Sequence, residues 1–386
     1  MRVTRRKVIG LGAGLAAAAL LPGRVFAAGG RVFSSPIRLL PNRVAIDATL
    51  AGRNLGFLID TGAPWSLIDN ELARGLKLEV LRTRRRVAGV GGTSDLPWYD
   101  AGEVRFGNGI RIPHMLFVGA RGGGFGPNLV GTFGSGLFTS YDSDLDFIRG
   151  EWRSYPDGRG DFSGLIHLPS RFVSSGDFGD KIAADATVDS FAGRFLLDTG
   201  MSGEALLDSK AAARSGLWRD DRPYAPTQSR GLGKGVALGR LVKAGKLSIG
   251  QFTFETPLVT LHKPGESALP DYDGVIGLAV LRLLDLTTQV STRSLWAAPS
   301  SAPPPPRGYP MSGLWVQGEG TQLRIADVGT GSPAAAAGLQ VGDTVIGVEF
   351  RTLLARITGP AGTKVSLTVE RDGKRRDVVL TLTPYL

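Results

Sequence analysis

A duplicated segment constrains the fold of this chain more than any other feature. When the sequence is shifted by 138 residues, RVAIDATLAGRNLGFLIDTG at 43–62 aligns without a gap with KIAADATVDSFAGRFLLDTG at 181–200. Nine of the twenty aligned positions are identical, and both copies end in Asp-Thr-Gly behind an apolar run. A repeat at so long a spacing indicates two related lobes rather than a solenoid of short units.

The two copies remain similar beyond the aligned block. After each Asp-Thr-Gly comes an apolar piece that ends in Asp, SLID at 66–69 and ALLD at 205–208, and each final Asp is expected to cap a short helix. Gly-rich turns follow at 89–92 and 230–235. Each copy then reaches an apolar-apolar-Gly element, and we expect these to be equivalent: Leu129-Val130-Gly131 and Val275-Ile276-Gly277.

Most other segments are short, rich in β-branched residues and bounded by Gly, Pro or Asp, which predicts an all-β fold of antiparallel type. A length of 386 residues allows two or three domains. We expect a first lobe at 28–160, a second lobe at 161–299, a stiff Pro-rich linker at 300–310 and a C-terminal β-rich domain at 311–386.

The repeated aspartates, Asp60 and Asp198, suggest acid–base chemistry. A single Asp behind a strand is often only a turn residue. Two of them in duplicated settings can meet across a pseudo-twofold axis, and carboxyl groups so close share one proton and titrate as a pair. Such a pair presents an acid and a base side by side, able to activate a water and to protonate a carbonyl oxygen.

Two Asp-Thr-Gly motifs, each with an apolar-apolar-Gly element, resemble those of retropepsin-like aspartic proteases, here with both lobes in one chain. The resemblance covers about residues 40–298. It implies a bilobal, acid-protease-like fold and a catalytic dyad of Asp60 and Asp198. It also implies supporting roles for the residues that complete the motifs, which are Thr61, Gly62, Thr199 and Gly200.

The resemblance also implies flaps that cover the substrate, with Gly91, Gly92, Gly231 and Gly233 as the candidates. One departure concerns the residue after each motif, which in this family is often Ser, Thr or Ala. Ala63 conforms, whereas Met201 does not. Neither side chain offers a hydroxyl to the carboxylates, so we expect a raised working pH rather than a loss of activity.

The C-terminal sequence GSPAAAAGLQVGD at 331–343 resembles the helix-and-turn segment of bacterial PDZ domains, and RTLLARIT at 351–358 is expected as the helix beside a peptide groove. The carboxylate-binding turn should then fall at Gly313, Leu314, Trp315 and Val316. Trp315 stands where that family usually has Gly. A groove that captures a peptide C-terminus and a degraded groove that serves only for packing therefore both remain open.

The N-terminus has the layout of an export signal. A basic start precedes an apolar stretch at 8–21 and small residues near Ala27, after which we expect cleavage, although a retained signal also stays open. The pair Arg5-Arg6 resembles a bacterial twin-arginine signal. The apolar stretch is shorter than a membrane span, so we expect a periplasmic or secreted protein without a stable membrane anchor.

Charge and residue counts exclude several classes of partner. The signal carries five of the 45 basic residues and no acids, which leaves 40 basic against 35 acidic residues in the mature chain, so nucleic-acid binding is not expected. The chain has no cysteine and hence no disulfide or thiol chemistry. Its three histidines, His114, His167 and His262, are scattered without ligand spacing, so we expect no metal and no cofactor.

Together these features predict an exported aspartic endopeptidase that cleaves polypeptides as a monomer, with a PDZ-like domain that aids substrate or partner binding. A catalytically silent protein that uses the two lobes as a peptide clamp is the alternative from another class. The intact pair of Asp-Thr-Gly motifs favours the enzyme. A maturation protease with a single protein substrate is a third possibility.

Overall fold

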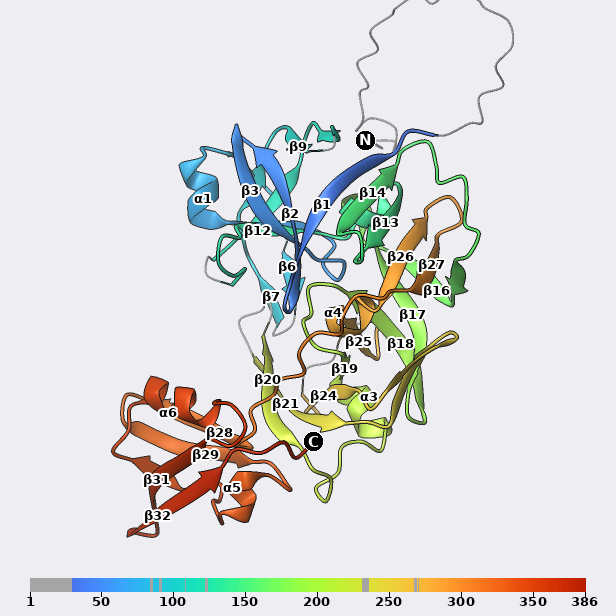
Figure 1. The fold of residues 1–386 in the computed structure, drawn as a ribbon. Helices are drawn as coiled ribbons and strands as arrows, with labels where there is room; N and C mark the ends of the chain where they lie inside the picture. The colour runs from blue at the N-terminus through green and yellow to red at the C-terminus, as the bar shows by residue number, and fades with distance from the viewer. Residues whose placement is uncertain are drawn as a thin grey trace, which may run out of the picture.

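The computed structural model describes residues 30–83, 86–89, 92–107, 109–121, 124–230, 236–266, 269 and 271–386. The predicted export signal lies outside these residues. The described chain is mainly β-strand, in three larger sheets and one two-stranded ribbon, which confirms the predicted all-β class (Figure 1). Among the described residues no helix has the length and apolar character needed to cross a membrane.

Five strands form the centre of the first lobe: β2 (Arg43–Leu50), β3 (Arg53–Ile59), β12 (Gly131–Phe133), β4 (Ser66–Asp69) and β11 (Leu116–Ala120). They are neighbours in that order. Strands β2 and β3 form an antiparallel hairpin, whereas β3 runs parallel to β12 and β4 runs parallel to β11. Parallel neighbours far apart in sequence bring the end of β3 against the end of β12.

The second lobe repeats this arrangement with β17 (Asp180–Val188), β18 (Phe191–Asp198), β25 (Gly274–Gly277), β19 (Ala205–Leu207) and β24 (Leu258–His262). Strands β18 and β25 are parallel, as are β19 and β24, and β19 is antiparallel to β25. The sequence repeat is therefore also a repeat of topology, and the molecule has two related lobes as predicted.

Shorter elements complete each lobe. In the first they are β5 (Glu79–Leu81), β6 (Val87–Gly89), β7 (Gly92–Ser94), β8 (Trp98–Asp100), β9 (Val104–Phe106), β10 (Arg111–Ile112), α1 (Asn70–Gly75) and α2 (Gly136–Thr139). In the second they are β16 (Ser170–Ser174), the 3-10 turn η1 (Gly176–Phe178), β20 (Ala225–Arg230), β21 (Val236–Lys243), β22 (Lys246–Ile249), β23 (Phe252–Glu255), α3 (Ser209–Arg214) and α4 (Leu278–Leu281).

The two predicted helix caps are present. The Asp69 carboxylate accepts a hydrogen bond from the Leu72 N–H at the start of α1 (2.7 Å), and Asp208 accepts one from the Ala211 N–H at the start of α3 (2.7 Å). A side-chain acceptor at this position satisfies a backbone donor that the helix itself leaves free. Both caps occur at the same place in the repeat, directly after β4 and β19.

A six-stranded antiparallel arrangement joins the lobes, in the order β15 (Ile166–Leu168), β27 (Ser294–Pro299), β26 (Leu284–Gln289), β13 (Asp142–Asp146), β14 (Glu151–Tyr155) and β1 (Phe33–Leu40). Strand β13 of the first lobe pairs directly with β26 of the second. Buried Asp144 accepts a hydrogen bond from the Thr287 hydroxyl (2.9 Å) across this junction. A continuous hydrogen-bonded sheet thus fixes one lobe relative to the other.

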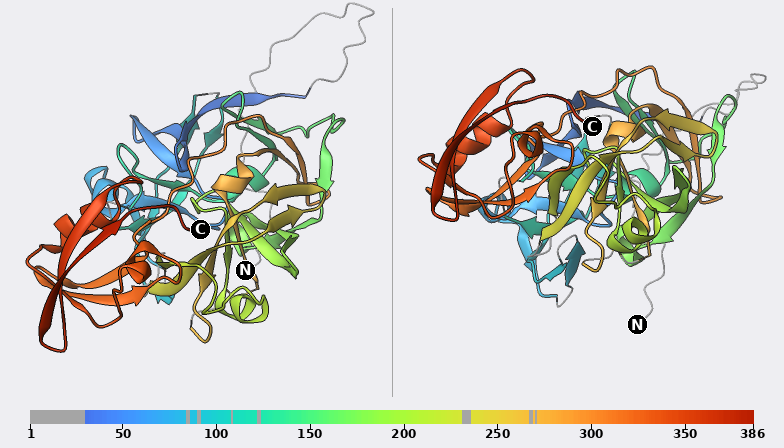
Figure 2. Two further views of the ribbon diagram at one scale, coloured as in Figure 1. Left: turned by 60° about the horizontal axis from the view of Figure 1, so that its bottom comes forward. Right: turned by 90° about the horizontal axis from the view of Figure 1, so that it is seen from below.

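The C-terminal unit is a five-stranded sheet with two short helices: β28 (Leu314–Glu319), β29 (Gln322–Val328), β30 (Thr344–Ile346), β31 (Lys364–Arg371), β32 (Lys374–Thr381), α5 (Pro333–Ala336) and α6 (Phe350–Ile357). It has its own hydrophobic core. The unit contacts the second lobe near β20 (Figure 2). There the Tyr224 hydroxyl donates to Asp327 (2.9 Å), and the Tyr385 hydroxyl donates to the Tyr224 carbonyl (3.1 Å).

Candidate active site

The two Asp-Thr-Gly motifs lie at the ends of equivalent strands. Asp60 directly follows β3, and its N–H donates to the Phe133 carbonyl of the parallel strand β12 (2.9 Å). Asp198 ends β18 opposite Gly277 of the parallel strand β25. Because each strand is fixed by neighbours on both sides, each aspartate is held at a rigid strand end rather than on a free loop.

The two threonines hold the lobes together beneath the aspartates. The Thr61 N–H donates to Oγ1 of Thr199 (3.1 Å), and the Thr199 N–H donates to Oγ1 of Thr61 (3.0 Å). Each hydroxyl then donates onward to a backbone carbonyl of the other lobe, Thr61 to Leu197 (2.8 Å) and Thr199 to Ile59 (2.7 Å). Both side chains are buried. This reciprocal set of four hydrogen bonds fixes the two motifs as a unit.

The glycines of the motifs allow the carboxyl groups to approach. A Cβ atom added to Gly62 would lie 2.3 Å from Cγ of Asp198, and one added to Gly200 would lie 2.6 Å from Cγ of Asp60. Each carboxyl group therefore occupies the space that a side chain on the other lobe's glycine would need. Only glycine fits at either position without displacing an aspartate.

Backbone donors surround both carboxyl groups. Asp198 accepts from the N–H groups of Gly200 (2.7 Å) and Met201 (3.2 Å), and Asp60 accepts from the Ala63 N–H (3.1 Å). Burial raises the pKa of Asp60 well above its ordinary range, and the charge of Asp198 raises it further. Burial also raises the pKa of Asp198, against the opposing effect of its backbone donors. The two carboxyl groups are therefore expected to share one proton and to titrate as a pair.

The apolar-apolar-Gly elements lie behind the aspartates, but the expected equivalence between them is wrong. In the first lobe Phe57 of β3 is paired with Gly131, and in the second its counterpart Phe195 is paired with Gly274. Gly131 thus corresponds to Gly274, three residues before the expected Gly277. The parallel pairing of strands decides this register, and the local apolar pattern does not reveal it.

The true counterpart of Val275-Ile276-Gly277 in the first lobe is Thr132-Phe133-Gly134. A Cβ added to Gly134 would lie 2.8 Å from the Trp65 carbonyl oxygen, in the loop that follows the first motif. A Cβ added to Gly277 would lie 2.2 Å from the Gly203 carbonyl oxygen, in the loop that follows the second. These two glycines therefore occupy matching places behind the two motifs.

The flap candidates lie in or beside hairpins. Gly92 opens β7, which pairs with β6 as a short ribbon, and Gly91 lies outside the described residues. Gly231 and Gly233 lie outside them as well, in the segment between the paired strands β20 and β21. Their role over a substrate stays a prediction.

Sequence reasoning missed an aromatic cluster next to Asp60. The rings of Trp65 and Trp98 are 6.2 Å apart, and Phe178 lies 5.0 Å from Trp98 and 6.3 Å from Trp65. All three contact the hydrophobic cluster that contains Leu58. Leu58 and Asp60 share one face of the chain, because residues two apart in a strand point the same way. Trp65 lies only a few residues after the first motif, and it was the one signal in the local sequence for this aromatic cluster.

The residues of the proposed carboxylate-binding turn lie at the start of β28. The Gly313 N–H donates to the Pro310 carbonyl (3.3 Å) and the Leu314 N–H donates to the Ser312 hydroxyl (3.3 Å). Trp315 is half-buried, and Val316 is paired with Ile325 of β29. The donors of Gly313 and Leu314 are thus engaged within the unit, and peptide capture here stays a prediction.

Within the described part of the chain, no group of three or more His, Asp or Glu side chains is arranged to hold a metal ion. Asp60 and Asp198 bring two carboxyl groups together, which is fewer than three.

Both lobes of the chain are similar to known proteins. The family described as "Aspartyl protease" matches residues 46–132 and 184–280. Solved structures similar to this chain include the aspartic proteinase from Irpex lacteus, 14% identical with a TM-score of 0.45, covering 70% of this chain and 98% of that one. The Basic 7S globulin from soybean is 9% identical with a TM-score of 0.41, covering 70% and 95%.

Two curated relatives match a short segment. They are named "Putative zinc metalloprotease" and come from Brucella suis biovar 1 and Brucella melitensis biotype 1. Each is 45% identical over 60 residues, which is 14% of this chain, and this chain spans only 16% of the length of either relative.

The family match is the comparison that bears on the site. Its two segments, 46–132 and 184–280, each contain one Asp-Thr-Gly motif; the first ends within the parallel strand β12, and the second includes its counterpart β25. Both lobes are therefore similar to the aspartyl protease family, and this similarity supports a protease-like function for the two-lobed part of the chain.

Proposed function

We propose that the protein is an aspartic endopeptidase in which Asp60 and Asp198 together hydrolyse peptide bonds. The observation that carries this proposal is the reciprocal threonine pairing, which places two half-buried carboxyl groups side by side, one from each lobe. Two close carboxyl groups share one proton. Each then has a different protonation state, as acid and base catalysis at one peptide bond requires.

One carboxyl group acts as the base and the other as the acid. The ionised member of the pair takes a proton from a water molecule held between the carboxyl groups, and the resulting hydroxide oxygen bonds to the carbonyl carbon. The protonated member gives its proton to the carbonyl oxygen, which completes a neutral tetrahedral intermediate. The scissile C–N bond then breaks: the member that took the water proton gives it to the leaving nitrogen, and the other member takes a proton from a hydroxyl of the intermediate, which restores the starting dyad.

The chain supplies both halves of the site, so we propose that it acts as a monomer on polypeptides after export to the periplasm or beyond. Hydrogen bonds to Tyr224, directly before β20, attach the C-terminal unit to the second lobe. Arg307 of the preceding linker also forms an ion pair with Glu204 (2.9 Å). We propose that the unit holds polypeptide substrates near the lobe, in keeping with its expected resemblance to a peptide-binding domain.

A mixed peptide library tests the proposed function. The mature protein is expected to cut peptides at internal bonds, to be inhibited by a statine-type mimic of the tetrahedral intermediate, and to be unaffected by a chelator. Peptide binding without cleavage would instead identify a silent clamp, and loss of cleavage with the chelator would identify a metalloprotease. Cleavage restricted to one partner protein would identify a maturation protease.

A further inference from the structure

One face of β17 and β18 extends from the dyad across the second lobe. Residues two apart share a face of a strand, so Leu196 lies on the same face as Asp198. Leu196 is paired with Ala183 of β17, the last pair between these two strands, and Lys181 lies two residues before Ala183 on the same face. Lys181 is close enough to Asp198 for the two charges to interact.

The Lys181 ammonium group lies over an aromatic ring. Its Nζ is 5.0 Å from the ring centroid of Tyr272, which is only 8% exposed and belongs to the same hydrophobic cluster as Ala183 and Leu196. Among the described residues Lys181 has no carboxylate within ion-pair distance. An ammonium held by a ring keeps its charge available to a ligand, because the ring satisfies it only weakly.

The Tyr272 hydroxyl is a second uncommitted group. It is buried and has no hydrogen-bond partner among the described residues. Burial raises the pKa of Tyr272 to about 12, so the hydroxyl remains a neutral donor. A buried hydroxyl without a partner costs stability unless a ligand uses it.

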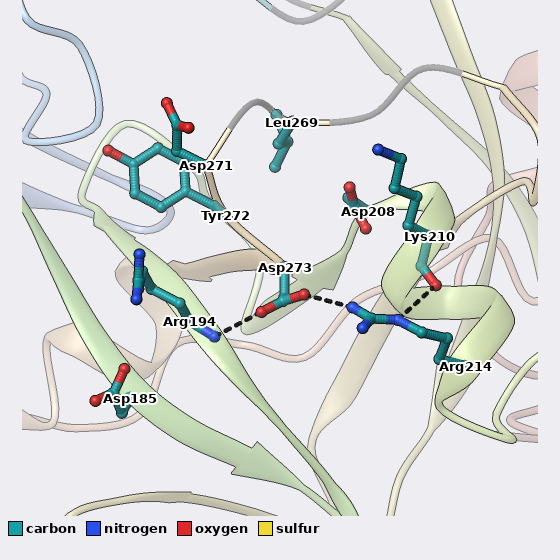
Figure 3. A pocket seen from close by; sticks show the side chains of 9 residues that line it. All are labelled: Asp185, Arg194, Asp208, Lys210, Arg214, Leu269, Asp271, Tyr272 and Asp273. Carbon is teal, nitrogen blue, oxygen red and sulfur yellow. Dashed lines mark hydrogen bonds and ion pairs between the residues drawn. The ribbon is translucent and has the colours of Figure 1, made fainter.

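A pocket of about 480 Å³ is lined in part by Tyr272 (Figure 3). Arg194, on the same strand face as Leu196, lines this pocket, and its buried Nε has no partner among the described residues. In Figure 3 the Arg194 guanidinium lies beside the Tyr272 ring, and no interaction is drawn from it to the other lining residues. A second cation is therefore free on this face.

Most acids around the pocket are already engaged. Asp273 forms an ion pair with Arg214 (2.6 Å), Asp185 forms one with Arg171 (3.0 Å), and Asp208 caps α3. Burial lowers the pKa of Lys181, and the nearby charges of Asp271 and Asp198 oppose this shift; exposed Asp271 forms no ion pair among the described residues. Two uncommitted cations against one exposed acid leave this surface with unsatisfied positive charge.

We propose that Lys181, with Tyr272 and Arg194, forms a subsite for an acidic side chain, so that preferred substrates carry Glu or Asp close to the scissile bond on the side that contacts the second lobe. This proposal rests on the proposed endopeptidase function. The first lobe offers the aromatic side chains of Trp65 and Trp98 instead, against which Phe178 of the second lobe packs. The acidic preference therefore applies to one side of the scissile bond only.

Matched peptides that differ by Glu against Gln at single positions around a cleaved bond test the subsite. The wild type is expected to cleave the best Glu peptide about tenfold or more faster, in kcat/KM, than its Gln counterpart. Lys181→Met keeps the stem length and removes the charge, and it should bring this ratio close to one. Because the ratio compares two substrates of one variant, a general loss of activity does not affect it.

Lys246→Met is the matched control. Lys246 is an exposed lysine of the same lobe, and in β22 it adjoins Leu247, which pairs with Val188 at the end of β17 away from Lys181. This variant should keep the wild-type Glu-to-Gln ratio. A ratio near one in the wild type at every position, or an unchanged ratio in Lys181→Met, would overturn the subsite while leaving the endopeptidase function intact.

The subsite can also be tested without turnover. Binding of the same peptide pairs to Asp198→Asn, measured by calorimetry, should show the Glu preference, and adding Lys181→Met should abolish it. If the wild type cuts no peptide, the endopeptidase proposal fails and this binding preference alone decides the subsite. Equal binding of Glu and Gln peptides would then contradict it.

Discussion

The two lobes are alike where they meet and differ where they face outward. Both bring an Asp-Thr-Gly motif to a strand end behind a parallel neighbour, and both cap a helix directly after the next strand. On the faces beside the dyad, the first lobe presents Trp65 and its aromatic neighbours, and the second presents Lys181 over Tyr272. The repeated residues build the dyad, and the residues that diverged shape what it can bind.

Substituting the glycine of each Asp-Thr-Gly motif tests the equivalence of the two lobes most strictly. Gly62→Ala and Gly200→Ala should each lower kcat/KM by about 100-fold or more, because the new Cβ displaces the carboxyl group of the opposite lobe. Gly75→Ala is the control, since its Cβ would meet nothing within 4 Å. Peptide-cleavage rates of the three variants decide the matter. A large loss for only one of the motif glycines would break the equivalence of the lobes.

The threonine pair should show the next largest effect. Thr61→Val and Thr199→Val each remove a buried hydroxyl that joins the lobes, and each should cost about 1–3 kcal/mol in the free energy of unfolding. The double variant should cost less than the sum, because both side chains belong to one network. Denaturant titration measures all three. Thr61→Ser keeps the donors and should stay near the wild type, and additive losses would show that the pair is not coupled.

The pH dependence of stability tests the burial of both aspartates. Burial raises the pKa of both carboxyl groups in the folded state, so their ionisation opposes folding. The free energy of unfolding therefore falls as pH rises from about 4, the ordinary carboxyl range, through the raised folded-state pKa. Asp60→Asn should therefore be more stable than the wild type at pH 7, with a difference that vanishes below about pH 4.

Asp198→Asn should show the same trend, because burial also raises the pKa of Asp198. Melting temperatures at pH 4 and pH 7 give both differences. Asp161→Asn is the control of opposite sign, since Ser163 lowers the pKa of that exposed carboxyl. A wild type more stable than Asp60→Asn at pH 7 would contradict the raised pKa.

The smallest expected effect is none at all. Strand pairing between β13 and β26 joins both lobes within one chain, so specific activity should not change when the enzyme is diluted. An enzyme assembled from two half-sites would lose activity steeply. Rates per molecule across a hundredfold dilution make the comparison, and a steep fall would show that each lobe pairs with a second copy.

Local signals predicted much of this fold. The Asp-Thr-Gly motifs, the caps at Asp69 and Asp208 and the all-β class follow from residues within a few positions of one another. The match of Leu129-Val130-Gly131 to Val275-Ile276-Gly277 was wrong, because the register of β3 against β12 depends on a partner more than 70 residues away. Only the pairing of Phe57 with Gly131 reveals it.

The substrate-facing surfaces were beyond sequence reasoning for a similar reason. Phe178 reaches the aromatic cluster of Trp65 and Trp98 from the 3-10 turn η1 of the second lobe. Tyr272 and Lys181 are about ninety residues apart and meet only through the fold. No sequence motif or periodic pattern marks either contact, so only the folded structure shows them.

The central claim is that one aspartate from each lobe forms a single catalytic unit. Single-turnover cleavage of one good peptide substrate by Asp60→Asn and by Asp198→Asn tests it most directly, with Asp161→Asn as the control and melting curves to confirm folding. Both dyad variants should lose about 10³-fold or more while remaining folded, and the control should keep its rate. A folded Asp60→Asn or Asp198→Asn variant within tenfold of the wild type would contradict the shared dyad.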